Sequence, residues 1–449
     1  MRWTQARRRA NSRAGSRSTM EPTTGNELSA IPGRIVDGPE ASRFEAELQR
    51  WEAICGDAGP SGRDAEAAVI EVPGGGGRFR YSGLADTLPA LELESRDPVV
   101  LAAAFLSAVR RKLPVVLVNP AWGEGERAQF ERLMAGATPR PGAILIPTGG
   151  TTGGVKLAEH EWASLQAAAL GLQDFLGGWP IDSCCLLPLH HVSGLMQVVR
   201  AVVTGGRVRF DAAGTAGRCL SLVPTQLQRA LGDAEAVAAL RHARVIFVGG
   251  APMGSDLAEA ARQAQLPLMP VYGMTETAAM VAAVPTENFL KNSRSGALPI
   301  GEASIDLMAG GQIRVRTPAL FRGYWGADPI NRAAGHPTGD IGFFDSDGGL
   351  HVKCRMDALI LSGGEKVDPA EVAAALCALD GVERALVVGE AHPEWGQQVV
   401  ARIVAAAGCP SADQLLESLR PRLASYKLPK RIDFLPEISG HDMADYEDK

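Results

Sequence analysis

The feature that most constrains the fold is a regular alternation of extended and helical patterns through the middle of the chain. Short apolar runs end at proline or glycine, and most are followed by a segment with helical periodicity. The expected strands are 183–187, 207–210, 220–223, 243–248 and 268–272, and the expected helices are 160–176, 194–203, 226–231 and 255–265. Such alternation predicts an α/β fold with largely parallel strands. Because ligands of such sheets bind beyond the carboxyl ends of the strands, the segments that follow the strands are candidate site residues.

The flanking regions divide the chain into two expected domains. Upstream, the patterns predict helices at 42–54, 98–112 and 124–136 and strands at 67–72, 78–81 and 114–118. Downstream, short strands and turns fill 304–353, and a second unit of strands and helices begins near residue 356. We therefore expect a large multi-layer N-terminal α/β domain at 21–355 and a small, mobile C-terminal α+β domain at 356–449. Residues 1–20 are rich in arginine and serine, and are expected to be a disordered tail or to precede the true start, with an organelle transit segment as the alternative.

Charge and cysteine content argue against several classes of function. A formal net charge of −6 lacks the basic footprint of a nucleic-acid-binding protein. The longest apolar run, 99–109, is too short to span a membrane. The seven cysteines are odd in number and form no C-x-x-C pair, so we expect no zinc site and a reducing compartment such as the cytoplasm. Cys184 and Cys185 lie in an apolar run and are expected to be buried thiols.

A segment rich in glycine and threonine follows the apolar run that ends at Pro147. It reads Thr148-Gly-Gly-Thr-Thr-Gly-Gly-Val-Lys156. Glycine lets backbone N–H groups approach a ligand, and the threonine hydroxyls and the lysine add donors and a positive charge, which are the needs of a polyphosphate. It is not a Walker A sequence, because Lys156 is followed by Leu157 rather than serine or threonine. On its own the segment is more typical of a flexible turn after a buried strand.

Two further motifs directly follow expected strands. The Gly-Gly-Ala-Pro motif at 249–252 has almost no side-chain bulk, so a planar base could lie against its backbone; a plain strand-to-helix turn is the alternative. The Tyr-Gly-Met-Thr-Glu-Thr motif at 272–277 offers an aromatic face for stacking and, in Glu276, a hard oxygen ligand for Mg²⁺. Taken alone, Glu276 could instead cap a helix.

Two weaker motifs lie near the expected domain boundary. Thr-Gly-Asp at 338–340 supplies an aspartate that could accept hydrogen bonds from ribose hydroxyls, although aspartate in a turn is usually only a turn residue. Arg-Met-Asp at 355–357 precedes Ser-Gly-Gly-Glu-Lys at 362–366. By itself this pair of segments is typical of an inter-domain hairpin with a solvated charge pair.

The order of these motifs is more specific than any one of them. Together with Pro-Leu-His-His-Val-Ser-Gly at 188–194 and Gly-Tyr-Trp at 323–325, the set closely resembles the adenylate-forming superfamily of acyl-CoA synthetases, adenylation domains and luciferases. The resemblance covers roughly 98–436. It implies a two-step reaction, in which an acid carboxylate attacks the α-phosphate of ATP to give an acyl-adenylate and pyrophosphate. A thiol, usually coenzyme A, then displaces AMP.

The resemblance also implies roles for individual residues. The catalytic residues would be Thr148, Lys156, Thr275 and Glu276, with Glu276 holding Mg²⁺ and Thr275 near the α-phosphate. The β- and γ-phosphates would be held by Thr148, Gly149, Gly150, Thr151, Thr152, Gly153 and Lys156. Adenosine would be bound by Gly249, Gly250, Ala251, Tyr272 and Gly273 at the base and by Asp340 and Arg355 at the ribose. Asp357 matches the family's hinge, about which the small domain rotates between half-reactions, and Gly363 and Gly364 would then line the thiol's tunnel.

The amino-acid sequence at 188–200 and 221–227 looks most like that of the o-succinylbenzoate–CoA ligases of menaquinone and phylloquinone synthesis. In that family the resemblance implies substrate contacts from His191, Ser193 and Arg200. The substrate carries two carboxylates, one of which reacts, and an arginine could grip the other bidentately. The alternative for Arg200 is a surface arginine that ends an amphipathic helix, and for His190, which has no implied role, the expectation is solvent exposure.

The C-terminal end departs from the family pattern. The family ends with Gly-Lys, whose lysine contacts the reacting carboxylate, whereas here His441 follows Gly440. No catalytic lysine is therefore assigned. The expected function is an ATP-dependent acid–CoA ligase; a ligase for another aromatic or acyl acid, or a degenerate homologue that binds adenylate without making it, are the alternatives. The expected partners are a small carboxylic acid, ATP and coenzyme A, with Mg²⁺ as cofactor, and a homodimer is left open.

Overall fold

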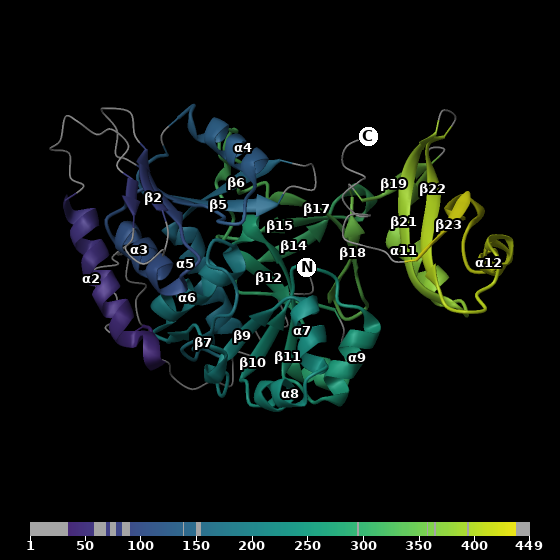
Figure 1. The fold of residues 1–449 in the computed structure, drawn as a ribbon, viewed down its shortest axis with the longest axis horizontal. Coiled ribbons are helices and arrows are strands. Elements are labelled where there is room, and N and C mark those ends of the chain that lie inside the picture. Colours follow the sequence, from purple (N-terminus) through teal and green to yellow (C-terminus); the bar gives the residue numbers. More distant parts are fainter. Residues whose placement is uncertain are drawn as a thin grey trace.

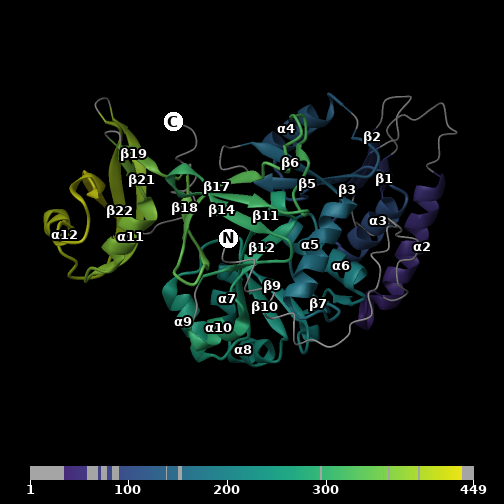
Figure 2. The same cartoon turned by 180° about the vertical axis from the view of Figure 1, so that it is seen from behind.

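The computed structural model describes residues 35–57, 69–71, 78–82, 90–137, 139–149, 154–293, 296–356, 358–362, 365–392 and 395–436. Two seven-stranded sheets and a four-stranded sheet form the larger part of the molecule, and a five-stranded sheet with its own helices lies at one end (Figure 1). Helix α2 (Ala41–Asp57) lies at the opposite end, as the reverse view in Figure 2 also shows. No helix among these residues is both long and apolar enough to cross a membrane.

The first large sheet has the order β1-β2-β3-β4-β5-β6-β16. Its strands are β1 (Val69–Glu71), β2 (Arg78–Ser82), β3 (Ala90–Glu94), β4 (Val115–Leu117), β5 (Ala143–Gly149), β6 (Val155–Glu161) and β16 (Gly323–Tyr324). Only β3, β4 and β5 run parallel, so this sheet is mixed rather than largely parallel. Helix α4 (Glu124–Met134) connects β4 and β5.

The second large sheet carries the expected parallel strands. Its order is β13-β12-β11-β10-β9-β7-β8, and the neighbours from β8 to β11 pair in parallel. Its strands are β7 (Ser183–Cys184), β8 (Val208–Arg209), β9 (Cys219–Leu222), β10 (Val245–Val248), β11 (Leu268–Met274), β12 (Ala279–Ala283) and β13 (Leu298–Pro299). Helices that connect its strands include α7 (Pro224–Leu231), α8 (Ala234–Arg241), α9 (Ser255–Gln263) and α10 (Thr286–Lys291). The alternation predicted from the apolar runs is therefore confirmed for this sheet.

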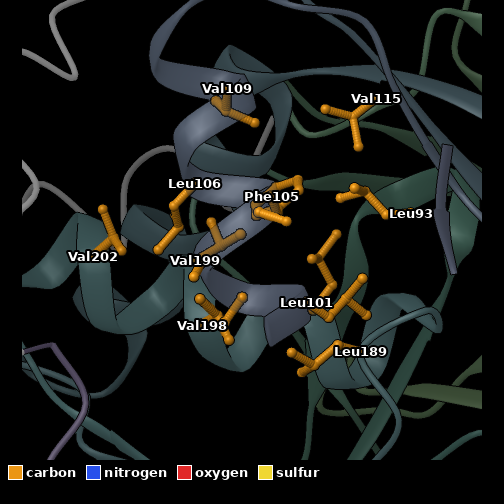
Figure 3. Packing of buried hydrophobic residues seen from close by; sticks show 14 of the residues in the cluster. Leu93, Leu101, Phe105, Leu106, Val109, Val115, Leu189, Val198, Val199 and Val202 are labelled. Atoms are coloured by element: carbon orange, nitrogen blue, oxygen red, sulfur yellow. The ribbon is translucent and has the colours of Figure 1, made fainter. Parts of the chain in front are cut away.

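The main hydrophobic core joins the two sheets through buried helices. Helix α3 (Pro98–Arg110) begins where the Asp97 side chain accepts the N–H of Val99 at 3.0 Å, with proline at the first helical position. Figure 3 shows Leu106 of α3 facing Val199 and Val202 of α6 (Val192–Thr204). Helix α5 (Trp162–Phe175) packs beside α6. Because α6 is buried along almost its whole length, any polar side chain on it needs an explanation.

A third sheet leads to the C-terminal unit. It contains β14 (Ser304–Leu307), β15 (Gln312–Arg316), β17 (His336–Phe344) and β18 (Leu350–Arg355). The C-terminal sheet contains β19 (Ile360–Ser362), β20 (Glu365–Val367), β21 (Val382–His392), β22 (Gly396–Ala405) and β23 (Arg431–Leu435), with helices α11 (Pro369–Cys377) and α12 (Ala412–Leu419). Short 3₁₀ helices are η2 (Gly38–Glu40), η3 (Ala212–Gly214), η4 (Thr275–Thr277), η5 (Ala309–Gly311) and η6 (Ser425–Lys427). The C-terminal unit has a separate apolar cluster that includes Val367, Val372 and Val399.

Candidate active site

The predicted phosphate-binding segment lies at the tip of an antiparallel hairpin. Strands β5 and β6 pair so that Thr148 lies opposite Lys156 and Gly149 opposite Val155. The predicted residues Gly150, Thr151, Thr152 and Gly153 lie outside the described residues. The N–H of Val155 donates to Oε1 of Gln129 at 2.9 Å, which ties the base of the loop to α4.

The hairpin brings Lys156 close to the predicted magnesium ligand. The hydroxyl of Tyr324 donates to Oε1 of Glu276 at 2.6 Å, and the Lys156 Nζ lies 5.7 Å from the centre of the Tyr324 ring. Glu276 is buried, and its backbone carbonyl accepts the N–H of Phe321 at 2.9 Å. Glu276 fits the chemistry of Mg²⁺, which takes one or two carboxylates and completes its shell with waters and phosphates.

Tyr324 is a site residue to which the sequence assigned no role. Its motif, Gly-Tyr-Trp at 323–325, is one of the motifs that carry the resemblance to the adenylate-forming superfamily. That membership was the one sequence signal that pointed to Tyr324. Strand β16 pairs with β6, which places Tyr324 beside Ala158 and within reach of Glu276. Burial and the adjacent Glu276 carboxylate raise the pKa of the Tyr324 phenol, so it stays a hydrogen-bond donor.

A second unassigned residue, His160, supports the loop that holds Thr275. The expected helix at 160–176 is wrong at its start, because His160 belongs to β6 and α5 begins at Trp162. Its Nε2 lies 2.8 Å from the carbonyl oxygen of Thr275, and its Nδ1 lies 2.9 Å from Ser164 Oγ. Since a carbonyl can only accept, Nε2 carries the proton. Full burial lowers the pKa of His160 to about 4, so the ring is neutral at physiological pH.

The backbone after Glu276 is held in an unusual conformation. Ala278 and Ala279 both have positive φ, of 51° and 77°. The Thr277 hydroxyl donates to the carbonyl of Ala279 at 2.7 Å and fixes this turn. At Gly273 a Cβ would lie 1.9 Å from that same carbonyl, so only glycine fits. Two strained alanines lie directly after the predicted catalytic residues Thr275 and Glu276, and backbone strain of this kind is concentrated at functional sites.

The predicted ribose-binding residues lie together. Asp340 and Arg355 are directly opposite on β17 and β18, and Arg355 Nη1 lies 3.6 Å from Asp340 Oδ1. The Tyr272 hydroxyl donates to Asp340 Oδ2 at 2.6 Å. Burial of the ring, and after it the Asp340 carboxylate, raises the pKa of Tyr272. The structure therefore joins the predicted base-stacking and ribose-binding residues in one network.

The predicted adenine-binding backbone begins where β10 ends. A Cβ at Gly249 would lie 2.7 Å from Val271 Cγ2, so this position needs glycine for close strand packing. Gly250 has a φ of +84°, and Ala251 is exposed. The backbone at this end of β10, beside β11, therefore carries almost no side-chain bulk. A planar base could lie against it.

The predicted acid-binding residues lie on α6 and at its N-terminus. Ser193 is partly buried and Arg200 is 2 % exposed. The alternative of a surface arginine is therefore wrong. The guanidinium lies near the thiols of Cys185 and Cys219 and 5.7 Å from the Phe247 ring centre, measured from Cζ. Desolvation lowers the pKa of Arg200 to about 10.

Arg200 has no anionic partner in the described part of the protein. Its Nε is fully buried without a hydrogen-bond partner. A buried charge that is unpaired costs several kcal/mol, so proteins keep one only where something else neutralises it. An anionic group from outside the described residues would satisfy this guanidinium.

The two adjacent histidines are placed differently from expectation. His190 is buried, at 7 % exposed, and burial lowers its pKa to about 4, so its predicted exposure is wrong. His191, the predicted pocket histidine, is exposed and precedes the first residue of α6. Their ring centres are 4.4 Å apart. Cys184 and Cys185 are buried as predicted, and burial raises the pKa of Cys185 to about 12.

Several predicted residues fall outside the described ranges. The hinge residue Asp357, the predicted thiol-tunnel residues Gly363 and Gly364, and the end of the chain from residue 437 are among them. Their assignments stay predictions.

Comparison with known proteins identifies the family. The model of the AMP-binding enzyme family matches residues 110–325, and that of the AMP-binding enzyme C-terminal domain matches 371–440. The 2-succinylbenzoate–CoA ligase of Bacillus velezensis is 32 % identical over 329 residues, 67 % of each chain. The chain belongs to the AMP-binding enzyme family. The predicted family is therefore confirmed.

Two other relatives are similar to this chain at comparable levels of identity. The 2-succinylbenzoate–CoA ligase of Geobacillus kaustophilus is 32 % identical over 66 % of each chain, and that of Enterococcus faecalis is 28 % identical over 78 % of this chain and 77 % of its own. The chain spans about two thirds of the length of the first two relatives.

Solved structures of the family confirm the fold. The o-succinylbenzoate CoA synthetase of Bacillus subtilis, in complex with its acyl-adenylate intermediate, matches with a TM-score of 0.67 and 23 % identity over 89 % of this chain and 90 % of its own. ATP-bound MatB of Rhodopseudomonas palustris matches with a TM-score of 0.69 and 22 % identity over the same shares. The predicted α/β fold, with a large N-terminal and a small C-terminal domain, is confirmed; the boundary at 355/356 stays a prediction.

Proposed function

We propose that the protein is an AMP-forming ligase that joins o-succinylbenzoate to coenzyme A. The observation that carries the choice of acid is the buried guanidinium of Arg200, which has no anionic partner in the described part of the chain. A substrate with two carboxylates can react through one and neutralise Arg200 with the other. The names of the relatives support the same acid.

The site residues support the first half-reaction. An oxygen of the substrate carboxylate attacks the α-phosphorus of ATP, and pyrophosphate leaves. Lys156 and the 148–154 segment would hold the leaving phosphates, and Glu276 would hold the Mg²⁺ that offsets their charge. Tyr324 fixes the Glu276 carboxylate, while His160 fixes the carbonyl of Thr275. The network of Tyr272, Asp340 and Arg355 would hold the nucleoside.

In the second half-reaction the thiol sulfur of coenzyme A attacks the acyl carbon, and AMP leaves. We place this step after a rotation of the small domain about Asp357, which would bring Gly363 and Gly364 to the acyl group. The cytoplasm is the proposed location, and a homodimer stays a prediction. A second candidate function is adenylate binding without adenylate formation, which the Gly440-His441 sequence favours because the family has a lysine there.

Acid-dependent exchange of pyrophosphate into ATP tests the proposal. In this proposal the carboxylate on the ring binds Arg200 and the carboxylate of the succinyl chain reacts. We expect exchange with o-succinylbenzoate and little with the analogue that lacks the ring carboxylate. Arg200→Lys keeps the charge but loses the planar fork, and should raise the KM for o-succinylbenzoate about 100-fold, the scale of a lost buried ion contact. Arg241→Lys, on the exposed surface of α8, is the matched control.

The outcomes separate the candidates. An unchanged KM in Arg200→Lys would show that the pocket is assigned wrongly. Tight binding of the acyl-adenylate without exchange for any acid would instead support the adenylate-binding homologue.

A further inference from the structure

Helix α6 carries a polar stripe inside the hydrophobic core. Ser193, Gln197, Arg200 and Thr204 are spaced four, three and four residues apart, so they share one face of the helix. Thr204 is satisfied, because its hydroxyl accepts the N–H of Ile181 at 2.8 Å and donates to the carbonyl of Arg200 at 2.7 Å. The two central members are not satisfied: Gln197 Oε1 and Arg200 Nε are both buried without a hydrogen-bond partner.

The orientation of the Gln197 amide is determined by its neighbour. Its Nε2 donates to the backbone carbonyl of Ser193 at 3.3 Å. Turning the amide over would put its oxygen against that carbonyl and lose the hydrogen bond. Gln197 is 1 % exposed, so Oε1 is an acceptor confined to the interior.

The two unsatisfied atoms are chemically complementary. Arg200 Nε–H is a donor and Gln197 Oε1 is an acceptor, and they lie on side chains three residues apart on the same helix face. Leaving both unpaired costs more than a leucine or methionine would at position 197, because each unsatisfied buried group is unfavourable. Gln197 is therefore hard to explain as a packing residue.

We propose that Gln197 is a positioning residue for Arg200 and thereby helps to determine specificity for diacids; this rests on the proposed function. When the second carboxylate of the substrate binds the two Nη groups of Arg200, Oε1 of Gln197 accepts the Nε–H and fixes the plane of the guanidinium. An amide suits this role because it accepts a hydrogen bond without cancelling the positive charge. A carboxylate at the same place would occupy the guanidinium and compete with the substrate.

Exposure along the stripe gives the direction from which the acid enters. His191 at the start of α6 is exposed, Ser193 is partly buried, and Gln197 and Arg200 are almost fully buried. The second carboxylate therefore binds at the inner end of the stripe, past Gln197. A monocarboxylic acid would leave both buried polar side chains unpaired, which disfavours it.

Two variants of Gln197 test the inference in the full-length protein. Gln197→Met keeps the length of the side chain and removes the acceptor, and should raise the KM for o-succinylbenzoate about tenfold with kcat nearly unchanged. Gln197→Glu keeps the shape and adds a charge, and should raise this KM about 100-fold by pairing with Arg200. Neither should change the KM for ATP. Gln263→Glu, on the exposed face of α9, is the control.

Binding without turnover gives a second measurement. The increase in Tm on adding o-succinylbenzoate should shrink in Gln197→Met and disappear in Gln197→Glu, while the analogue without the ring carboxylate gives equal shifts in all variants. If both variants keep the wild-type KM and Tm shift while Arg200→Lys loses them, the role of Gln197 is refuted and the proposed function stands. If Arg200→Lys also behaves as wild type, the proposed acid pocket fails with it.

Discussion

Replacing Arg200 should stabilise the protein while it abolishes binding of the acid. Burial lowers the pKa of this guanidinium from 12.5 to about 10. A pKa difference of roughly 2.5 corresponds to about 3 kcal/mol, which is the order of magnitude by which the charged form is disfavoured in the folded state. Because the pKa in the folded state is lower than in the unfolded state, this cost is present at neutral pH and is relieved only above about pH 10.

Arg200→Met removes the charge and keeps an apolar side chain of similar length. We expect the free energy of unfolding at pH 7 to rise by about 1–3 kcal/mol, since replacement of buried charges by apolar groups gains this much in other proteins. For a domain of this size, the rise in Tm should be about 2–4 °C for each kcal/mol. Added o-succinylbenzoate should stabilise the wild type by about 2.7 kcal/mol at a concentration of 100 times its Kd, and should not stabilise the variant.

Thermal unfolding followed by circular dichroism, with and without the acid, measures both effects. Arg229→Met on α7 serves as the control, because its side chain is exposed and its loss should change neither quantity. A variant that is less stable than the wild type would refute the reasoning about burial, because Arg200 would then have a partner within the protein. A variant that o-succinylbenzoate still stabilises equally would refute the role of Arg200 in binding the acid.

Three further predictions concern the nucleotide side of the site. Tyr324→Phe removes the 2.6 Å hydrogen bond to Glu276 and should raise the Mg²⁺ concentration needed for half-maximal exchange about fivefold to thirtyfold, while an unchanged Mg²⁺ titration would contradict this role. His160→Leu should lower the free energy of unfolding in urea by about 1–3 kcal/mol, because it leaves a buried carbonyl unpaired. Since the folded pKa of His160, about 4, lies below the unfolded value of 6.5, wild-type stability should fall as the pH drops from 6.5 to 4, and the variant should show a shallower slope; an equal slope would disprove this assignment. Gly273→Ala should abolish exchange, because the added Cβ has no space. The control Gly125→Ala in α4 has open space around its Cβ and should be neutral or slightly stabilising. A Gly273→Ala variant that keeps its activity would contradict this prediction, because the loop could then shift.

The fold was predictable where local pattern and tertiary structure agree. The parallel strands β9, β10 and β11 are apolar runs that proline or glycine ends, so their period and their boundaries are both visible in the sequence. His160 was assigned to the wrong element, because β6 continues directly into α5 and no glycine or proline marks the change. The burial of His190 and the exposure of His191 depend on how the chain enters α6, which neighbouring residue types do not reveal.

The site was predictable as a set of motifs but not as a network. The motifs and the family resemblance implied Glu276, Asp340 and Arg355 individually, yet the hydroxyls that bind the first two belong to Tyr324 and Tyr272, which come from other strands. The complementary unpaired atoms of Gln197 and Arg200 are apparent only from three-dimensional burial. Pairings between distant segments carry no local signature, so Tyr324 and His160 were left without a role, and Tyr272 was predicted to contact the base but not to bind Asp340.

The two alanines after Glu276 have a consequence for how this protein could evolve. Each holds a left-handed backbone conformation that costs an L-residue about 1–2 kcal/mol, and glycine would remove that cost at both positions. A search for greater heat resistance should therefore select glycine at Ala278 or Ala279. Glycine would also widen the range of backbone conformations next to Glu276 and so hold its carboxylate less firmly. The more heat-resistant variants should therefore have a lower kcat. In this chain the two alanine methyl groups therefore restrict the loop to a narrow set of conformations at a cost in folding stability.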